Sequence, residues 1–245
     1  MPLTRYAPTP SGYLHAGNLL NFEITRQLAE DVGADIALRI DDADASRYRR
    51  EFVEDIFDRL RQAGLDWTIG PTSAEDFEAN WSQRRKTAYY REHLDVLRDS
   101  ALVLYACTCS RKDIADVPVG GCPGGCRSGA HRLEPEVSAL RVAVDPDTTI
   151  EIAGQPIPLG RALGDFVVWR RDDLPAYQLV SVIEDRDLGT THIVRGEDLL
   201  DSSAAQIFLA RALGAENVLR AHYVHHELVL DADGRKLSKS QQAPL

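Results

Sequence analysis

The first 40 residues contain the feature that most constrains the fold. Residues 3–7 form an apolar stretch typical of a buried strand, and a loop with Pro and Gly follows at 8–12. Apolar residues at four-residue spacing then predict a helix over 19–31, with Gly33 as its stop signal. A second strand is predicted at 35–40. Because a strand–helix–strand unit joins parallel strands, we expect an α/β fold.

The rest of the chain alternates helix-like and strand-like segments, with one change of character. The expected elements are helices over 52–63 and 81–98, strands at 102–106, 139–144, 149–152 and 166–169, and further helical and strand signals at 177–183, 191–194, 202–213 and 223–230. Residues 107–132 are rich in Gly, Cys and Pro, and the strands that follow alternate as antiparallel strands do. We therefore expect a nucleotide-binding domain in two halves, 1–102 and 167–245, split by an inserted α+β module at 103–166.

Charge and hydropathy narrow the possible classes. The chain of 245 residues has a net charge of −10, which disfavours general nucleic-acid binding. Residues 84–86 and 170–171 are candidate basic patches for backbone contacts, and a solvated surface explains each equally well. No apolar run approaches the roughly 18 residues of a membrane span, and the N-terminus enters a strand directly, without an evident signal peptide. We expect a cytoplasmic monomer that has no membrane contact.

Two short motifs near opposite ends of the chain suggest a phosphate site. His15, Gly17 and Asn18 stand where a helix is expected to start, so backbone N–H groups and a positive dipole end become available to phosphate. Gly17 permits a close approach of the backbone, and the side chains of His15 and Asn18 can donate hydrogen bonds. Lys236 and Lys239 add positive charge in a second loop. The alternative is a helix cap and an unrelated basic turn.

Four cysteines form a compact pattern in the middle of the chain. Cys107 and Cys109 are one residue apart, Cys122 and Cys126 three, and 12 residues separate the two pairs. Four thiolates on two short turns suit a closed tetrahedral zinc site with a structural role, because no coordination position stays open. The alternatives are two disulfides, four unrelated thiols, or a site in which His131 replaces one cysteine.

Several stretches together resemble one family. They are Arg5–Gly12, the two motifs with His15 and Lys236, Leu38–Asp44, Ser82–Arg84, Ala176–Leu179 and Thr191–Asp198. In this order they resemble the HIGH and KMSKS motifs and the intervening segments of class I aminoacyl-tRNA synthetases, and they are most similar to the glutamyl enzymes. The cysteine pattern and the short C-terminal part resemble the glutamyl-queuosine tRNA(Asp) synthetase subgroup, which has the catalytic part without an anticodon-binding domain. That resemblance implies a Rossmann-like class I synthetase fold, with the inserted module binding the acceptor.

The resemblance also implies a glutamate site. Arg5, Tyr177 and Arg195 would hold the side-chain carboxylate, since guanidinium groups bind carboxylates at two points and a phenol adds a donor. The α-amino end would meet Ala7, Thr9 and Asp41, and Tyr6 and Pro8 complete the implied set. On the residues alone, Arg5 and Arg195 could equally form surface salt bridges and Tyr177 could be a core side chain.

For ATP, the resemblance implies that His15, Gly17, Asn18 and Lys239 bind the nucleotide together with Mg²⁺. His15, Asn18, Lys236 and Lys239 would be the catalytic residues. The implied reaction activates L-glutamate as its adenylate and transfers it to queuosine of tRNA(Asp), not to the 3′ end of a tRNA. Two alternatives stay open: the same activation with another acceptor (a tRNA 3′ end, a carrier protein or a small amine), and a non-catalytic protein that binds glutamate or RNA.

Three departures from the family pattern stand out. Asp41 replaces a usual Glu, which shortens the side chain that would face the α-amino group. Cys122 replaces a tyrosine that commonly fills one zinc position, and four thiolates should bind zinc at least as well. The sequence ends five residues after Ser240, where the subgroup continues into further helices.

Overall fold

The computed structural model describes residues 1–115, 117, 121–123 and 125–228. The Lys236–Lys239 motif therefore lies outside the described residues. Within the described ranges, no helix combines the length and the apolar composition that a membrane span requires. The chain divides into two compact units, and each is described by itself.

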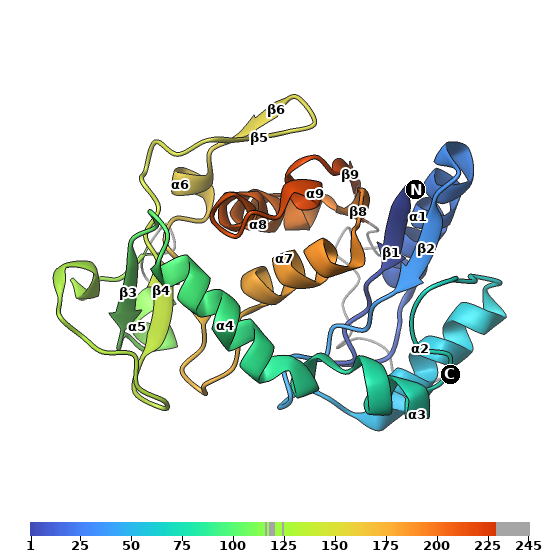
Figure 1. Ribbon diagram of the computed structural model, residues 1–245, viewed down its shortest axis with the longest axis horizontal. Helices are drawn as coiled ribbons and strands as arrows, with labels where there is room; N and C mark the ends of the chain where they lie inside the picture. Colours follow the sequence, from blue (N-terminus) through green and yellow to red (C-terminus); the bar gives the residue numbers. More distant parts are fainter. Residues whose placement is uncertain (116, 118–120, 124, 229–245) are drawn as a thin grey trace. The chain divides into compact units, whose positions relative to one another are not determined.

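The first unit comprises Met1–Lys86, Gly189–Leu199 and Ala221–Leu245. Its elements are β1 (Leu3–Tyr6), α1 (Ala16–Val32), β2 (Asp35–Leu38), α2 (Arg50–Gln62), α3 (Ala74–Asp76), a π-helical turn (Phe77–Trp81), a 3-10 turn (Gln83–Lys86), β8 (His192–Gly196), a 3-10 turn (Glu197–Leu199) and β9 (His222–His226). Strand β1 pairs in parallel with β2, and β8 pairs in parallel with β9. The predicted parallel strand–helix–strand opening is confirmed, and Figure 1 shows α1 beside the β1–β2 pair.

Thr191 connects the two strand pairs. Its backbone N–H donates to the carbonyl of Leu3 at 2.9 Å, and its hydroxyl accepts from the backbone N–H of Leu3 at 2.8 Å. These bonds bring β8 alongside β1. The β1–β2 pair and the β8–β9 pair therefore lie side by side in the first unit, with β8 next to β1.

Helix α1 is fixed at both ends by local chemistry. His15 caps its N-terminus, and Gly33 caps its C-terminus in the left-handed conformation with φ of 64°. The predicted stop at Gly33 is confirmed, because a residue without Cβ adopts positive φ at little cost. The helix begins at Ala16, earlier than the predicted start near Asn18. The reason is the capping box, which makes Asn18 the third residue of the helix.

The hydrophobic core of the first unit lies on one face of the sheet. Its buried residues are Tyr6, Leu14, Phe22, Leu38, Ile40, Val53, Ile56, Phe57, Leu60, Leu65, Ala74 and Phe77. They come from β1, β2, α1, α2, α3, the π-helical turn and the connecting loops, and α1 and α2 cover the face of the β1–β2 sheet to which Tyr6 and Leu38 point. Side chains alternate along a strand. Arg5 therefore points to the opposite face, which these helices leave uncovered.

The second unit comprises Thr87–Leu188 and Leu200–Arg220. Its elements are α4 (Thr87–Arg98), β3 (Leu104–Cys107), α5 (Arg111–Ala115), a 3-10 turn (Cys126–Ser128), β4 (Ala139–Val142), β5 (Ile150–Ile152), β6 (Gln155–Ile157), α6 (Leu159–Ala162), β7 (Phe166–Trp169), α7 (Tyr177–Leu188), α8 (Leu200–Ala212) and α9 (Glu216–Leu219). Strands β3, β4 and β7 form an antiparallel sheet, and β5 and β6 form a hairpin. The predicted antiparallel strands are confirmed, whereas the short elements β6, α6 and α9 were not predicted.

The helix predicted over 81–98 is wrong in its first turns. The α-helix begins only at Thr87, after the π-helical turn Phe77–Trp81 and the 3-10 turn Gln83–Lys86. Ser82 interrupts the helical path with ψ of 126°. Side-chain and backbone donors of residues 82–84 bind Asp42 instead, which explains why an amphipathic sequence pattern does not continue as one helix.

Candidate functional site

The His15–Asn18 motif forms a closed capping box at the start of α1. His15 Nδ1 accepts a hydrogen bond from the backbone N–H of Gly17 at 3.1 Å, and Asn18 Oδ1 accepts from the backbone N–H of His15 at 3.2 Å. A neutral imidazole that accepts at Nδ1 carries its proton on Nε2. The cap thus uses Nδ1 of His15 and Oδ1 of Asn18 as acceptors, so the imidazole Nε2–H and the amide N–H₂ are the donor groups of the motif.

Gly17 is required by the cap itself. A Cβ at this position would lie 3.1 Å from two atoms of the His15 ring, tighter than ordinary contacts allow. The contact with the His15 ring thus disfavours a side chain at this position even without a ligand. A larger side chain would displace the His15 imidazole before any ligand arrived.

Two arginines of the first unit are buried, Arg5 on β1 and Arg195 on β8. Arg5 is 2% exposed and Arg195 is 4% exposed. Neither is a surface salt bridge, the alternative that the sequence left open. Charged groups at this depth are expensive unless other groups stabilise them. Buried guanidinium groups on two strands that lie next to each other are suited to holding a carboxylate.

His225 shares the face of Arg195, although the sequence gave no reason to single it out. It pairs in register with Arg195 across β8 and β9, so the two side chains share a face. Burial, and then the charge of Arg195, lower the pKa of His225 from 6.5 to about 4. The imidazole is therefore neutral at physiological pH. The sequence around Tyr223 indicates a strand. Only the register of β9 with β8 shows that His225 is paired with Arg195.

Asp41 is held close to the loop that follows β1. Its backbone N–H donates to the carbonyl of Pro8 at 2.8 Å. Its carboxylate accepts from Arg39 at 2.8 and 3.0 Å and from Gln83 Nε2 at 2.8 Å. The structure thus brings together Asp41 and the Ala7–Thr9 loop, as the resemblance implied. It also gives the Asp41 carboxylate protein donors that sequence reasoning missed.

Asp42 explains the Ser82–Arg84 stretch. Its carboxylate is buried and accepts from Ser82 Oγ at 2.6 Å, from the Gln83 backbone at 2.7 Å and from Arg84 Nε at 2.7 Å. The Arg84 guanidinium also stacks on the Tyr48 ring at 3.7 Å. The charge of Arg84 thus helps to fix the acidic segment, and its membership of an RNA-contacting patch stays a prediction.

The second basic patch has structural partners as well. Arg170 pairs with Asp172, and Arg171 donates to the carbonyls of Thr108 and Cys109 at 2.8 and 2.9 Å. The predicted contact of Arg170 and Arg171 with an RNA backbone stays a prediction. Arg171 contacts the segment that carries the cysteines.

Tyr6 does not share the face of Arg5. It is fully buried, its ring lies 5.2 Å from that of Phe22, and among the described residues its hydroxyl has no hydrogen-bond partner. Burial raises its pKa to about 12. Tyr6 is therefore a core residue, and its place in the implied glutamate set is not supported.

Tyr177 is the first residue of α7 in the second unit. It is 43% exposed, so it is not the core side chain that the sequence allowed as an alternative. An exposed phenol at a helix start remains available as a donor to a ligand.

The four cysteine sulfurs converge in the second unit. All four lie within 4.8 Å of one another, with Cys109 Sγ at 3.3 Å from Cys122 Sγ and at 3.8 Å from Cys126 Sγ. Disulfide sulfurs would be about 2.0 Å apart, and all four thiols are free. Four sulfurs at about 2.3 Å from a zinc ion would be about 3.8 Å from each other. The cluster therefore fits a tetrahedral metal, and the disulfide alternative is excluded.

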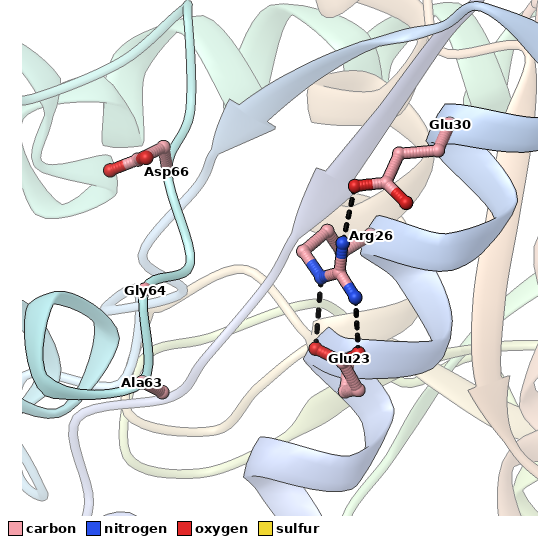
Figure 2. A pocket seen from close by; sticks show the side chains of 6 residues that line it. All are labelled: Glu23, Arg26, Glu30, Ala63, Gly64 and Asp66. Atoms are coloured by element: carbon pink, nitrogen blue, oxygen red, sulfur yellow. Dashed lines mark hydrogen bonds and ion pairs between the residues drawn. The ribbon is translucent and has the colours of Figure 1, made fainter.

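A pocket of about 500 Å³ in the first unit is lined by Glu23, Arg26, Glu30, Ala63, Gly64 and Asp66. Figure 2 shows Arg26 bound to both glutamates. With three carboxylates and one engaged guanidinium, the pocket repels phosphate. None of the expected site residues lines it.

Comparison with known proteins identifies the family. Residues 3–114 and 134–245 match the model of the catalytic domain of class I tRNA synthetases (E and Q). The chain belongs to this family. The unmatched residues between the two segments include Cys122 and Cys126.

More specific similarity comes from curated relatives. The chain is 37% identical to the Glutamyl-Q tRNA(Asp) synthetase of Pseudomonas paraeruginosa (strain DSM 24068 / PA7), over 98% of this chain and 78% of that protein. It is 39% identical to the Glutamyl-Q tRNA(Asp) synthetase of Cupriavidus metallidurans, over 98% of this chain and 77% of that protein.

A solved structure supports the fold. The glutamate–tRNA synthetase of Elizabethkingia anophelis superimposes with a TM-score of 0.74 at 21% sequence identity, over 98% of this chain and 52% of that protein. The chain thus spans about half the length of that synthetase. The α/β fold of a class I synthetase catalytic domain is confirmed.

Proposed function

We propose that the protein activates L-glutamate with ATP as glutamyl-adenylate and transfers it to queuosine of tRNA(Asp), as a ligase of the aminoacyl-tRNA synthetase type. The observation that carries this proposal is the burial of two arginines on neighbouring strands, Arg5 on β1 and Arg195 on β8. The family to which the chain belongs is that of the class I tRNA synthetases (E and Q). The names of the relatives support the acceptor.

The glutamate side-chain carboxylate is bound by Arg5 and Arg195, with Tyr177 as a further donor. Two guanidinium groups in a region of low dielectric favour an ionised carboxylate over a neutral amide. Asp41 supplies the counter-charge for the α-amino group, and the Ala7–Thr9 loop lies beside it. The three bonds to Asp41 from Arg39 and Gln83 fix the position of this carboxylate, which compensates for the side chain being shorter than Glu.

Adenylation needs positioning and charge, not a protein nucleophile. One oxygen of the glutamate α-carboxylate attacks the α-phosphorus of ATP, and the bond to pyrophosphate breaks with its electron pair staying on pyrophosphate. His15 and Asn18 donate to phosphate oxygens from the capping box, and Gly17 keeps their geometry. Lys236 and Lys239 stabilise the charge that develops on pyrophosphate. Mg²⁺ with ATP supplies further charge neutralisation. An acceptor oxygen then attacks the adenylate carbonyl, and AMP leaves.

The four cysteines hold a structural zinc ion. The sulfur donor set and its close approach fit Zn²⁺, and four protein ligands leave no open position. The zinc stabilises an inserted module at 103–166 between the two halves of the catalytic domain, 1–102 and 167–245. Metal analysis of freshly purified protein should find one zinc per chain, and Cys126→Ser should lose it. Zinc-free wild-type protein would overturn this assignment.

Two assays test the activity. Glutamate-dependent exchange of pyrophosphate into ATP without RNA should occur, and its absence in folded protein would favour a non-catalytic binder. Labelled glutamate should then enter tRNA(Asp) that contains queuosine and should remain after the terminal adenosine is removed by periodate and β-elimination. Label that disappears with that adenosine would indicate transfer to the 3′ end. Exchange without any labelling of tRNA would indicate another acceptor.

A further inference from the structure

One residue fastens both ends of the cysteine-bearing segment. The Nη2 atom of Arg171 donates to the carbonyl of Thr108 at 2.8 Å and to that of Cys109 at 2.9 Å, where the segment leaves β3. The backbone carbonyl of Arg171 accepts from the N–H of Glu136 at 2.7 Å, just before the segment enters β4. Glu136 is held there with φ of 62°. Arg171 therefore joins the two ends of the segment from Thr108 to Glu136. This segment contains Cys109, Cys122 and Cys126 and begins directly after Cys107.

Arg171 is itself presented by a fixed turn after β7. Trp169 Nε1 donates to Asp173 Oδ1 at 3.0 Å, and Arg91 of α4 donates to the same oxygen at 2.7 Å. The Arg91 guanidinium also lies over the Trp169 ring at 4.6 Å. The turn is thus tied to a helix of the same unit. An anchor held in this way can restrain the cysteine segment instead of moving with it.

The contact to Thr108 continues to a sulfur through a single peptide group. The carbonyl of Thr108 and the N–H of Cys109 belong to the same peptide, and this N–H donates to the sulfur of Cys107. A donor on the carbonyl polarises the amide and strengthens the bond made by its N–H. The charge of Arg141 acts on Cys107 directly, so Arg171 acts on this sulfur only through the polarised peptide. Four thiolates around one divalent ion carry net negative charge, which such a donor stabilises.

We propose that Arg171 is a positioning residue for the metal of the cysteine cluster. It fixes the Thr108–Cys109 backbone so that the first pair of sulfurs faces Cys122 and Cys126, and it polarises a peptide toward Cys107. The inference rests on the proposed zinc site. Partners of this kind typically change metal affinity about 10–100-fold when they are removed.

The test compares full-length Arg171→Ala and Arg171→Lys with Arg170→Ala, in which the neighbouring arginine that pairs with Asp172 is removed. Zinc transfer to a chromogenic chelator should be about 10–100-fold faster in Arg171→Ala. Arg171→Lys should restore part of the loss, because an ammonium keeps the positive charge and the N–H donors but sits on a shorter side chain without the planar guanidinium geometry. Arg170→Ala should release zinc at the wild-type rate.

Substitution of cobalt(II) for zinc gives an absorption spectrum whose shape does not change when the protein only becomes less stable. In Arg171→Ala the thiolate–cobalt absorption should change shape at full cobalt occupancy, which reports altered sulfur geometry. An unchanged spectrum together with wild-type zinc release would overturn the proposal, and so would equal effects of the two arginine variants. If Arg171→Ala does not fold, Arg171→Lys must still show faster release than Arg170→Ala. Wild-type protein that binds neither zinc nor cobalt would overturn the zinc site itself. This result differs from one in which the metal binds but Arg171 has no effect on it.

Discussion

Removal of the Asp42 carboxylate should strongly destabilise the first unit. This side chain is buried and accepts hydrogen bonds from Ser82, from the backbone of Gln83 and from Arg84. In Asp42→Ala all three donors lose their acceptor, and the Arg84 charge loses its partner. Asp42→Asn keeps the shape and one acceptor oxygen, but it turns an N–H₂ group toward donors.

The magnitude follows from burial. Truncating one partner of a buried ion pair costs about 3–5 kcal/mol, since the other charge is left without compensation. The Arg84 side chain is 32% exposed, so water can solvate it in part. We therefore expect the lower end, about 3 kcal/mol, for Asp42→Ala. Asp42→Asn should cost about 2 kcal/mol, because hydrogen bonds to a charged group contribute about 1.5–3 kcal/mol each and some are retained in weaker form.

Equilibrium unfolding in urea measures the effect, with circular dichroism and tryptophan fluorescence as separate probes. The control is Asp58→Ala in the same unit, where the aspartate is 65% exposed and lies 3.4 Å from Arg61. Such exposed pairs contribute about 0–1 kcal/mol. If the free energies of unfolding of Asp42→Ala and Asp58→Ala differed by less than about 1 kcal/mol, the reasoning would be refuted. The Ser82–Arg84 stretch would then not depend on this carboxylate.

Three further predictions concern the proposed site. Lys239→Ala should lower the rate of pyrophosphate exchange by about 2–4 kcal/mol of activation free energy, with little change in glutamate affinity; unchanged turnover would remove the loop from the phosphate site. Arg195→Ala should reduce glutamate use strongly and narrow the preference over glutamine, which leaves cationic donors facing an amide N–H₂; an exchange assay on wild-type protein that ranks glutamine first would contradict the pocket. His225 has a lowered pKa of about 4 in the folded state, so the unfolded chain binds its proton first and stability should fall as pH drops from about 6.5 toward 4. Because His225 is partly exposed, its share is about 1–2 kcal/mol, and His225→Gln should show a correspondingly flatter acid profile in urea unfolding.

Elements set by local chemistry could be predicted from the sequence. Helix α1 ends at Gly33 because this residue adopts the left-handed backbone conformation that closes a helix. The four cysteines converge because the two short turns that carry them allow their sulfurs few other arrangements. The parallel pairing of β1 and β2 follows from the short connection through one helix. These predictions are confirmed because their causes lie within a few residues or within one structural unit.

Features that depend on contacts distant in sequence could not be predicted. Asp42 and Ser82 are 40 residues apart, and nothing in the local pattern at 81–86 shows that these residues would leave a helical path to bind a carboxylate. Tyr6 lies next to Arg5 in the sequence, and only the position of α1 and α2 shows which of the two faces the core. His225 becomes relevant only through its register with Arg195. The roles of these residues follow from the direction of the strands and from the packing.

The net charge of −10 does not prevent an acidic amino acid or ATP from binding, because charge matters by location. Exposed carboxylates such as those of Glu23 and Glu30 are screened by water and salt over about 10 Å. Arg5 and Arg195 are buried, and a charge at an effective dielectric constant of about 20 interacts about four times more strongly than one in water. A nearby carboxylate ligand therefore experiences these two arginines far more than the distributed surface charge. The neutral state of His225 leaves this attraction constant across physiological pH, so the proposed site would discriminate between glutamate and glutamine by charge while the surface stays acidic.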